Sequence, residues 1–371
     1  MRILALIPQL GPGGAERTMV QLAGFLSRRH EFRIMTWEGP DVTPFYPTPA
    51  DTVVIRANLF GPLHGTRIGG IVARICAIRR VIRNFRPHVI LSFMDATNII
   101  ALAASFRSGV PVVISERVDP QHHSIGRFKA AMRLIFYPWA DRIVVQTQRV
   151  ARYFPIRIRR KISVIANPVL AAEAIARPGE PDSSGRFHIV AAGRLTAQKA
   201  FDTLIDSFAA IAMRFPQWDV TIFGEGEDRR LLESKICKYN LDGRVRLPGI
   251  SNQLGSELAK AHVLAFPSRY EGFPNVLAEG LAAGLPAVGF ADVSGVEDLI
   301  LDGRTGLLVR PAQDCASFAQ ALSSLMSNKH MRIRMGAEAR AHVLSWAPER
   351  ILPLWENVLS AAASDRPIHC A

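Results

Sequence analysis

Two glutamates eight residues apart, Glu271 and Glu279, stand in a segment punctuated by glycine and proline. Glu271 follows the expected strand His262–Pro267, and Pro274 suits the first turn of the expected helix Asn275–Ala283. Glu279 then lies about one turn into that helix. The alternative is one capping acid and one exposed helical acid. If the pair is functional, its carboxylates can accept hydrogen bonds from neighbouring hydroxyl groups, with the free N–H groups of Phe273–Val276 directed at an anion between them.

Two cations, Arg194 and Lys199, follow the expected strand Phe187–Gly193 and precede the expected helix Phe201–Arg214. Arginine can bind two phosphate oxygens at once, and lysine adds a compact charge. Each charge-assisted hydrogen bond is worth roughly 1.5–3 kcal/mol. This spacing beside a helix start predicts a diphosphate clamp; the alternative is two solvated cations on an exposed loop.

A glycine-rich loop, Gly11-Pro12-Gly13-Gly14-Ala15-Glu16, joins the expected strand Ile3–Pro8 to the expected helix Ala15–Arg28. Glycines let a backbone approach a ligand closely, and the helix start offers N–H groups to an anion. The loop almost spells the dinucleotide-binding pattern, and Glu38 is in reach of the ribose-binding position. A dehydrogenase and a plain tight turn therefore stay open as alternatives.

Other candidate residues carry weaker signals. Asp95 follows the expected strand His88–Ser92, where it could cap the next helix or contact a substrate. His122 and His123 are adjacent, so their side chains diverge and a metal site is not expected. No nucleophile elbow and no phosphate-binding loop with Gly-Lys-Ser/Thr is present.

The elements that would position these residues alternate between short apolar strands and longer helical patterns. Continuous apolar strands are typical of parallel sheets covered on both faces. Ligands bind such sheets beyond the carboxyl ends of the strands. Besides those already named, the expected strands are Phe32–Trp37, Thr52–Arg56, Val110–Ser115, Arg142–Val145, Ile162–Ile165, Val220–Gly224, Val245–Leu247 and Ala287–Phe290, and the expected helices are Arg67–Asn84, Ala96–Ser105, Arg127–Tyr137, Asp228–Tyr239, Ala316–Met326 and Pro348–Ala363.

The chain of 371 residues is long enough for about two domains. The pattern restarts after a stretch with three prolines and a Ser-Ser-Gly end, which is typical of a linker. We therefore expect two doubly wound α/β domains, with a cleft between them as the default binding site. The expected bounds are 1–167 for the first domain, 168–185 for the linker, 186–345 for the second domain and 346–371 for a final helical segment.

Charge is distributed unevenly. The chain has 45 Lys and Arg and 32 Asp and Glu, and residues 1–180 contain 25 of the basic residues but only 11 of the acidic ones. An excess of this size predicts an anionic partner for the first half: nucleic acid, a membrane surface or a phosphorylated substrate. The four cysteines are widely spaced, and no apolar run approaches the roughly 18 residues of a spanning helix. We expect a cytoplasmic protein without disulfides.

Together, these motifs resemble the retaining GT-B glycosyltransferases called family 4. The resemblance covers most of the chain and is carried most specifically by the Glu271–Glu279 spacing with the Arg194–Lys199 pair. Further matching segments are Gly13-Gly14-Ala15-Glu16-Arg17, Gly224-Glu225-Gly226, Gly284-Leu285-Pro286, Gly295-x-Glu297, Asp302-Gly303-x-x-Gly306 and the stretch around Trp346.

The resemblance implies a second domain that holds a nucleotide sugar, usually a UDP-sugar. Arg194 and Lys199 would bind the diphosphate, Glu279 the ribose and Glu271 the donor sugar, which makes Arg194, Lys199 and Glu271 the expected catalytic residues. The final helix would return to the first domain. No metal and no cofactor is expected, and the sequence contains no Asp-x-Asp. The remaining donor-binding residues implied are Gly13, Gly14, Gly193, Gly272, Phe273, Asn275 and Val276.

Two positions depart from the family pattern, and one of them is Ser294, which replaces the first glycine of a frequent Gly-Gly-x-x-Glu pattern. At the other position, many members have a histidine just after a strand of the first domain, beside the reacting sugar, whereas this chain has Ser115-Glu116-Arg117. Glu116 or Arg117 would occupy that place. With Asp95, they are the candidate residues on the acceptor side.

The expected activity is α-retaining transfer of a hexose or N-acetylhexosamine from a UDP-sugar to a growing glycan, which we expect to be polyprenyl-diphosphate-linked. Arginine clusters interleaved with apolar residues favour an anionic membrane surface, which fits a lipid-linked acceptor at the inner face of the cytoplasmic membrane. No nucleic-acid-binding module is recognisable. Two alternatives stay open: a UDP-sugar 2-epimerase of the same fold and a non-catalytic membrane-bound scaffold.

Overall fold

The computed structural model describes residues 1–59, 68–121, 126–311 and 313–365. It divides into two compact units: residues 1–168 together with 349–371, and residues 169–348. Arg67, His122, His123 and Cys370 lie outside the described residues.

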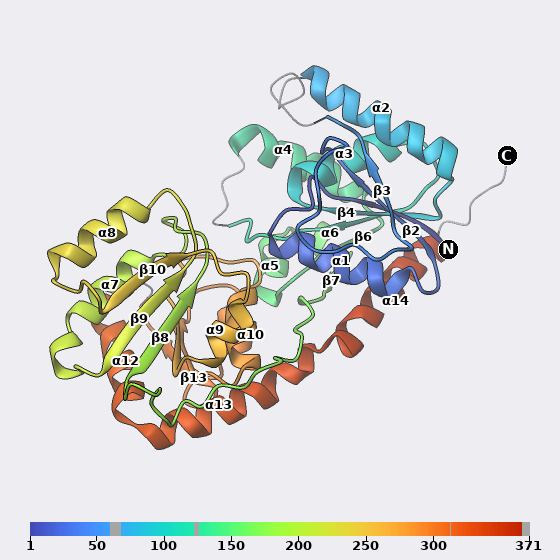
Figure 1. Ribbon diagram of the computed structural model, residues 1–371. Helices are drawn as coiled ribbons and strands as arrows, with labels where there is room; N and C mark the ends of the chain where they lie inside the picture. Colours follow the sequence, from blue (N-terminus) through green and yellow to red (C-terminus); the bar gives the residue numbers. More distant parts are fainter. Residues whose placement is uncertain (60–67, 122–125, 312, 366–371) are drawn as a thin grey trace. The chain divides into compact units, whose positions relative to one another are not determined.

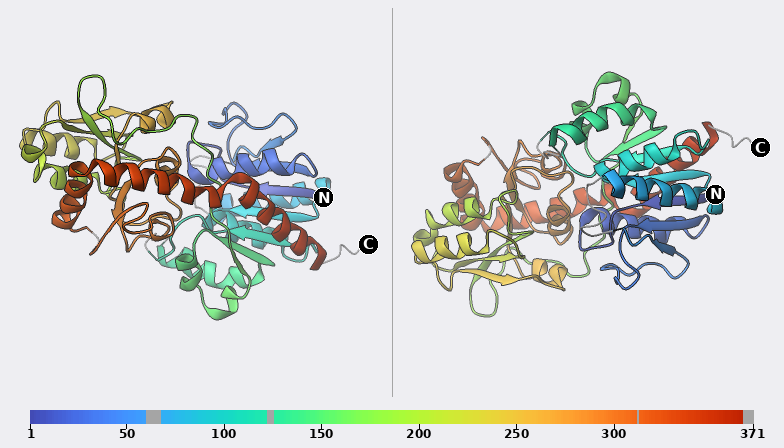
Figure 2. Two further views of the ribbon diagram at one scale, coloured as in Figure 1. Left: turned by 90° about the horizontal axis from the view of Figure 1, so that it is seen from below. Right: turned by 90° about the horizontal axis from the view of Figure 1, so that it is seen from above.

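The first unit is a parallel sheet of seven strands in the order β3-β2-β1-β4-β5-β6-β7. Its interior strands are mainly apolar and almost entirely buried, because helices cover both faces. Helices α1 and α14 lie on one face, and α2 and α3 lie on the other (Figures 1 and 2). The elements are β1 (Arg2–Leu6), α1 (Gly14–Leu26), β2 (Glu31–Thr36), β3 (Val53–Arg56), α2 (Ile68–Phe85), β4 (Val89–Phe93), α3 (Asp95–Ser105), β5 (Val112–Ser115), α4 (Gly126–Phe136), the 3-10 helix η1 (Tyr137–Trp139), β6 (Arg142–Val145), α5 (Gln148–Tyr153), α6 (Ile156–Arg159) and β7 (Ile162–Val164).

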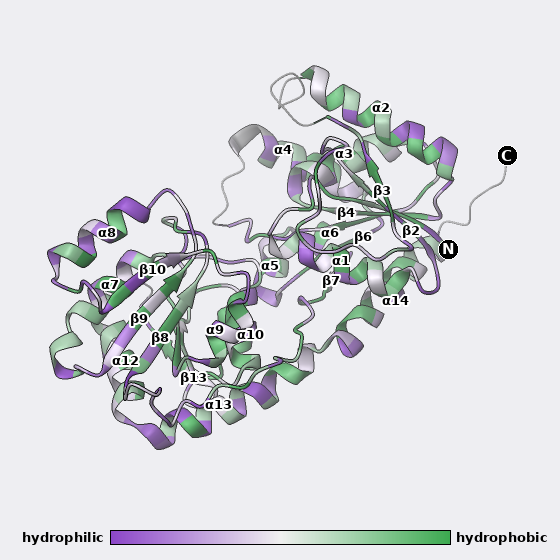
Figure 3. Ribbon diagram, viewed as in Figure 1, coloured by the Kyte–Doolittle hydropathy of each residue, from purple (hydrophilic) through white to green (hydrophobic). Residues whose placement is uncertain are grey.

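The second unit repeats the design with a parallel sheet of six strands, in the order β10-β9-β8-β11-β12-β13. Its core is apolar, as the hydropathy colouring of the strands shows (Figure 3). The elements are β8 (Phe187–Ala192), α7 (Phe201–Ala209), η2 (Ala212–Arg214), β9 (Trp218–Phe223), α8 (Arg229–Lys238), β10 (Val245–Gly249), α9 (Leu254–Ala259), β11 (Val263–Phe266), α10 (Asn275–Ala282), β12 (Ala287–Phe290), α11 (Val296–Leu299), β13 (Gly306–Val309), α12 (Cys315–Ser327), α13 (Lys329–Val343) and η3 (Leu344–Trp346).

The predicted fold class, two doubly wound parallel-sheet domains, is confirmed, and each predicted strand overlaps a strand of the structure. The sequence patterns did not predict strand β13, helix α13, the short helices α5, α6, α9 and α11, or the 3-10 helix η3. Strand β13 begins at Gly306, where a Cβ would lie 2.2 Å from the carbonyl oxygen of Ala287, so this glycine permits the ladder instead of breaking it. Helix α13 was missed because its buried face includes Arg332, whose guanidinium donates to the carbonyl oxygens of Pro178, Leu325 and Met326.

The segment expected to link the domains packs within the second unit. The Ala176 N–H donates to the Ala283 carbonyl oxygen at 2.8 Å, and the Val169 N–H donates to the Trp346 carbonyl oxygen at 2.8 Å. The Pro178 carbonyl oxygen accepts from Arg332 at 2.6 Å. These backbone contacts hold residues 169–178 against the unit that follows them.

Helix α14, Pro348–Asp365, packs in the first unit. Trp355 is fully buried there, with its ring centroid 5.5 Å from that of Phe93 in β4. His30 contacts the Glu356 carboxylate at 2.9 Å, and Arg142 pairs with Asp365. The last helix therefore completes the core of the sheet formed by the start of the chain.

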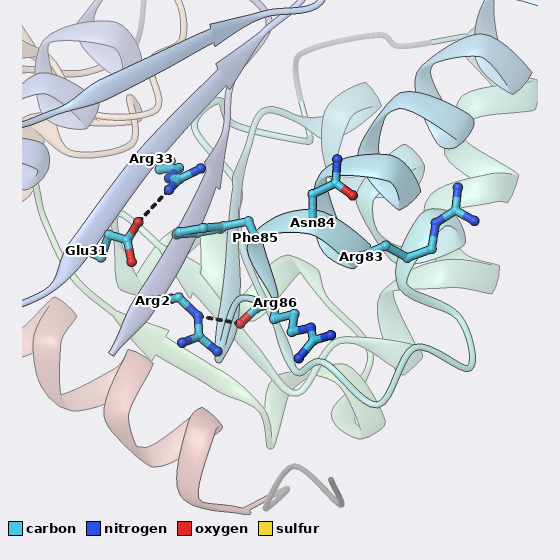
Figure 4. A pocket seen from close by; sticks show the side chains of 7 residues that line it. All are labelled: Arg2, Glu31, Arg33, Arg83, Asn84, Phe85 and Arg86. Atoms are coloured by element: carbon cyan, nitrogen blue, oxygen red, sulfur yellow. Dashed lines mark hydrogen bonds and ion pairs between the residues drawn. The ribbon is translucent and has the colours of Figure 1, made fainter. Parts of the chain in front are cut away.

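A shallow hollow lies at the amino ends of β1 and β2, opposite the edge where strand carboxyl ends meet (Figure 4). Arg33 donates to Glu31 at 2.6 Å, and its guanidinium lies 4.1 Å from the centroid of the Phe85 ring. Arg2 donates to the Arg86 carbonyl oxygen at 2.8 Å. The hollow thus joins the end of α2 to the sheet, and its position separates it from the glycine-rich loop after β1.

We expect Trp355→Ala to lower the free energy of unfolding by about 3–5 kcal/mol, because it removes the largest buried side chain of α14. Urea denaturation followed by circular dichroism measures the change. The matched control is Leu354→Ala, since Leu354 is exposed on the same helix, and its effect should stay within about 0.5 kcal/mol. Equal effects of the two variants would contradict the packing described for α14.

Candidate active site

The loops after β8 and β9 are packed backbone against backbone. Gly224 has a φ of 141°, and a Cβ on it would lie 1.9 Å from the Gly193 carbonyl oxygen. A Cβ on Gly226 would lie 2.2 Å from the Leu195 carbonyl oxygen. The Leu195 N–H donates to the Glu225 carbonyl oxygen at 2.9 Å. Only glycine permits this approach, which fixes the course of residues 193–195 at the carboxyl edge of the sheet.

The loop after β11 is attached to the same place by two hydrogen bonds. The Arg269 N–H donates to the Gln198 carbonyl oxygen at 2.8 Å, and the Gln198 side-chain amide donates to the Tyr270 carbonyl oxygen at 2.9 Å. Because β8 and β11 are neighbouring strands, their following loops meet at one edge of the sheet.

This arrangement brings together Lys199 and Glu271, which are 72 positions apart. Lys199 Nζ lies 2.6 Å from Glu271 Oε1, and the exposed fractions of the two side chains are 19% and 8%. The ammonium also lies 5.6 Å from the centroid of the Phe266 ring. A half-buried ion pair holds its partners in place, because removing either one leaves a poorly solvated charge.

Arg194 differs from Lys199 in its surroundings. It is exposed, and among the described residues no carboxylate pairs with it. Gly193, immediately before it, has a φ of 155°, and a Cβ there would lie 3.1 Å from Lys199 Cε. The two cations therefore start from neighbouring backbone, one held by Glu271 and the other available to an anion.

The second glutamate of the predicted pair lies on α10. Pro274 precedes this helix, and Glu279 is its fifth residue and half-buried. Phe273 is buried, whereas Gly272, Asn275 and Val276 are half-buried at the start of the helix. Cations and carboxylates thus share the carboxyl edge of β8 and β11, a combination that suits a ligand with both phosphate and hydroxyl groups.

In the first unit, the glycine-rich loop ends at the start of α1. Gly13 precedes the helix, and a Cβ on it would lie 2.1 Å from Glu16 Oε2, so the carboxylate occupies the space that a side chain would need. Burial raises the pKa of Glu16, opposed by its own backbone N–H and by Arg117. The dehydrogenase alternative assigned a ribose to Glu38, which here accepts from the Leu10 N–H at 3.0 Å.

Arg117 is buried beside that helix. Its Nη2 donates to Thr18 Oγ1 at 2.9 Å and to Asn167 Oδ1, and its guanidinium lies 4.6 Å from the centroid of the Phe93 ring. Burial lowers the pKa of Arg117 to about 9. Within the described part of the chain, its Nε and Nη1 have no hydrogen-bond partner.

Glu116 points into the protein rather than to its surface. The Tyr137 hydroxyl donates a hydrogen bond to Glu116 Oε2 at 2.7 Å, and Arg133 Nη1 lies 3.9 Å from the same oxygen. Burial, with a contribution from the charge of Asp95, raises the pKa of Glu116 to about 7, although the Tyr137 hydrogen bond acts in the opposite direction. Of the two residues after Ser115, Arg117 therefore faces α1 and Glu116 faces Tyr137.

Asp95 is the first residue of α3, and its Oδ1 accepts from the Ala96 N–H at 2.6 Å. The position before the helix belongs to Met94, whose φ is 78°. Asp95 therefore contacts the first turn without being the capping residue.

Sequence reasoning missed the partners of this buried cluster. Thr18 lies one turn after Gly14 and Asn167 directly precedes Pro168, so both positions carried a weak signal. For Tyr137 there was none. Among the described residues, no group of His, Cys, Asp and Glu could hold a metal ion, and no helix is long and apolar enough to cross a membrane.

Comparison with known families gives two matches that together span most of the chain. Residues 12–172 match the model described as Glycosyltransferase Family 4, and residues 174–342 match the model of Glycosyl transferases group 1. These matches support a group 1 glycosyltransferase. The prediction of a glycosyltransferase is supported, while the hexosyltransferase class and the stereochemistry of transfer stay predictions.

Two full-length relatives are glycosyltransferases of bacterial glycan assembly. The amylovoran biosynthesis glycosyltransferase AmsD of Erwinia amylovora is 28% identical over 97% of this chain and 99% of its own length. An α-1,4-N-acetyl-D-galactosaminyltransferase of Campylobacter jejuni, which acts on a GalNAc-containing PP-undecaprenol glycan, is 25% identical over 97% of this chain and 98% of its own.

Solved structures share the fold. Sucrose-phosphate synthase from Thermosynechococcus elongatus superposes with a TM-score of 0.83, at 19% identity over 97% of this chain and 100% of its own. The Anabaena protein Alr3699/HepE, solved in complex with UDP-glucose, has a TM-score of 0.76 at 19% identity over 97% of this chain and 100% of its own. The glycosyltransferase therefore has the GT-B fold predicted from its sequence.

We expect Gly224→Ala to disrupt the loops after β8 and β9, because the added Cβ would collide with the Gly193 carbonyl oxygen. The melting temperature and the affinity for uridine diphosphate should both fall. Gly255→Ala is the matched control: Gly255 lies in α9 with open space around its Cβ position, so this variant should be neutral or slightly stabilised. A Gly224→Ala protein that behaves like this control would refute the close packing.

The pKa of Glu116 predicts a pH-dependent stability. The Glu116 carboxyl group binds its proton more tightly in the folded protein than in the unfolded chain, where its pKa is 4.5. The contribution of Glu116 to the free energy of unfolding therefore falls as the pH rises from about 4.5 to about 7. The substitution Glu116→Gln removes this pH dependence, because the glutamine side chain does not titrate. The difference in free energy of unfolding between variant and parent, measured in urea, should shift in favour of the variant between about pH 5 and about pH 8. Parallel pH profiles would show that Glu116 titrates normally.

Proposed function

We propose that this glycosyltransferase transfers a hexose or N-acetylhexosamine from a UDP-sugar to a growing polyprenyl-diphosphate-linked glycan, with retention of the anomeric configuration. The observation that carries the proposal is the Lys199–Glu271 pair beside the exposed Arg194. The family resemblance assigns these residues to the diphosphate and the donor sugar. A related fold solved with UDP-glucose supports the choice of a uridine nucleotide.

In the proposed reaction, the diphosphate of the donor binds Arg194 and Lys199, and its negative charge competes with Glu271 for the Lys199 ammonium. Glu271 is then free to accept hydrogen bonds from the donor sugar, and Glu279 from the ribose. No separate cofactor is required, because the nucleotide sugar itself supplies the group that is transferred.

Retention follows if the acceptor hydroxyl attacks the anomeric carbon on the face from which the nucleotide departs. The bond from that carbon to the β-phosphate oxygen breaks, the bond to the acceptor oxygen forms, and the β-phosphate takes the acceptor proton. Arg194 and Lys199 contribute because the charge on the departing phosphate grows as the bond breaks, and fixed cations stabilise that change most strongly in the transition state.

The acceptor proposal rests on charge and on one relative. The relative from Campylobacter jejuni acts on a PP-undecaprenol glycan. In the present chain, the basic excess lies in the first 180 residues. A lipid-linked acceptor would place the enzyme at the inner face of the cytoplasmic membrane.

We expect Arg194→Ala and Lys199→Ala each to reduce kcat roughly a hundredfold while weakening the affinity for uridine diphosphate much less, because the lost charge acts mainly in the transition state. Turnover with a UDP-sugar and calorimetric nucleotide binding measure the two effects. Arg230→Ala is the control, since Arg230 is exposed on α8. Full turnover in either test variant would contradict the clamp.

Product analysis in the same assay separates the two remaining classes of function. A UDP-sugar 2-epimerase would convert the donor without any acceptor, and a scaffold would leave it unchanged. The α configuration of the new linkage, read by nuclear magnetic resonance, tests retention.

A further inference from the structure

One outer surface of the first unit carries an unusual number of exposed apolar side chains. They belong to α4, η1, α6 and the residue directly after α3. These elements contact one another as α3 with α4, α4 with η1, α3 with η1, and α6 with η1. The Phe106 and Trp139 rings stack with centroids 5.1 Å apart, and Phe136 meets Trp139 edge-on at 4.9 Å. We call this surface the aromatic patch; its members are Phe106, Leu134, Ile135, Trp139 and Ile156.

The patch is exposed to an extent that packing within the chain does not explain. Exposed fractions run from 44% for Trp139 to 60% for Ile156, with Leu134 at 54%. These residues therefore have apolar area available for a partner.

The charge around the patch has one sign. Residues 96–161 contain twelve Lys and Arg and three acids. Of the acids, Glu116 and Asp119 are buried, and Asp141 is half-buried with its carboxylate accepting from the Val112 N–H at 2.9 Å. The exposed cations in this stretch of the chain are Arg107, Arg152, Arg157, Arg159 and Arg160.

Two cations, Lys161 and Arg107, are held beside the apolar groups. Lys161 Nζ donates to the Pro138 and Ala140 carbonyl oxygens at 2.7 and 2.9 Å, on either side of Trp139. The Arg107 guanidinium lies 5.4 Å from the centroid of the Phe106 ring. Aromatic rings flanked by long cationic side chains suit the boundary between lipid headgroups and acyl chains.

Charge complementarity selects the occupant. The cores of protein–protein interfaces are depleted in charge, whereas this patch lies among many cations of one sign. An anionic bilayer offers a broad surface of the opposite sign together with an apolar layer beneath it.

We propose that the aromatic patch docks on an anionic lipid bilayer, with Trp139 and Phe106 at headgroup depth and Arg107, Arg157 and Arg160 facing lipid phosphates. This deepens the proposed membrane location and rests on it, since it identifies the face of the first unit that would contact lipid.

The test uses the full chain and vesicles of phosphatidylcholine with or without phosphatidylglycerol, and measures flotation at low salt. The variant Leu134→Glu/Ile135→Glu should reduce the partition coefficient roughly 25-fold, because each unfavourable charge at the surface is worth about fivefold. The matched control is Met213→Glu/Leu231→Glu, which changes two exposed apolar residues of the second unit and should bind as the parent does. Circular dichroism confirms that both variants fold.

Tryptophan emission gives a second measurement. All five tryptophans lie in the described residues; Trp37, Trp218 and Trp355 are buried and Trp346 is half-buried, so Trp139 is the exposed one. Anionic vesicles should shift its emission to shorter wavelength, and Trp139→Phe should abolish that shift while flotation persists.

Equal flotation of the Leu134→Glu/Ile135→Glu variant and the parent would overturn the proposal, as would equal binding to vesicles that lack phosphatidylglycerol. Self-association of the parent that the variant loses would also overturn it, because the patch would then cover a second copy of the chain. The vesicles contain no sugar, so failed flotation leaves the transferase proposal intact. If the protein floats with the vesicles but transfers no sugar, only the transferase proposal is contradicted.

Discussion

Backbone contact between the loops after β8 and β9 is the constraint on which the donor side of this molecule depends. Because Gly224 and Gly226 have no side chains, the two loops touch at Gly193 and Leu195, and the backbone that carries Arg194 has a fixed course. The loop after β11 then hydrogen-bonds to residue 198, which places Glu271 against Lys199. The positions of the charged groups at this edge of the sheet are thus set by the course of the backbone.

The first unit contains a different kind of polar cluster. Arg117, Thr18 and Asn167 connect the loop after β5 to α1 and to the end of the unit, while Glu116 and Tyr137 form a separate buried pair. Burying charged groups costs free energy unless partners compensate, and here several guanidinium nitrogens have none among the described residues. A buried cluster of this kind lowers the stability of the fold, and such costs are typical of residues that have a functional role.

Much of this architecture could be predicted because its signals are local. Continuous apolar strands identified the parallel sheets, and the positions of Arg194, Lys199 and Glu271 after strands identified the edge where two of them meet. The direction of Glu116 could not be predicted, because it depends on Tyr137, which arrives from a different element. Helix α13 was not predicted because Arg332, a charged residue, lies on its buried face. Strand β13 was not predicted because a glycine such as Gly306 usually indicates the end of a strand, and its close contact with Ala287 is visible only in the structure.

The return of α14 to the first sheet has a consequence for synthesis. Residues 169–348 form one contiguous stretch, so the second unit contains its whole core within a single continuous part of the chain. The unit translated first must wait, because Trp355 fills its core from near the other end of the polypeptide. The first unit therefore keeps apolar surface uncovered until residues 349–365 have been synthesised and have left the ribosome.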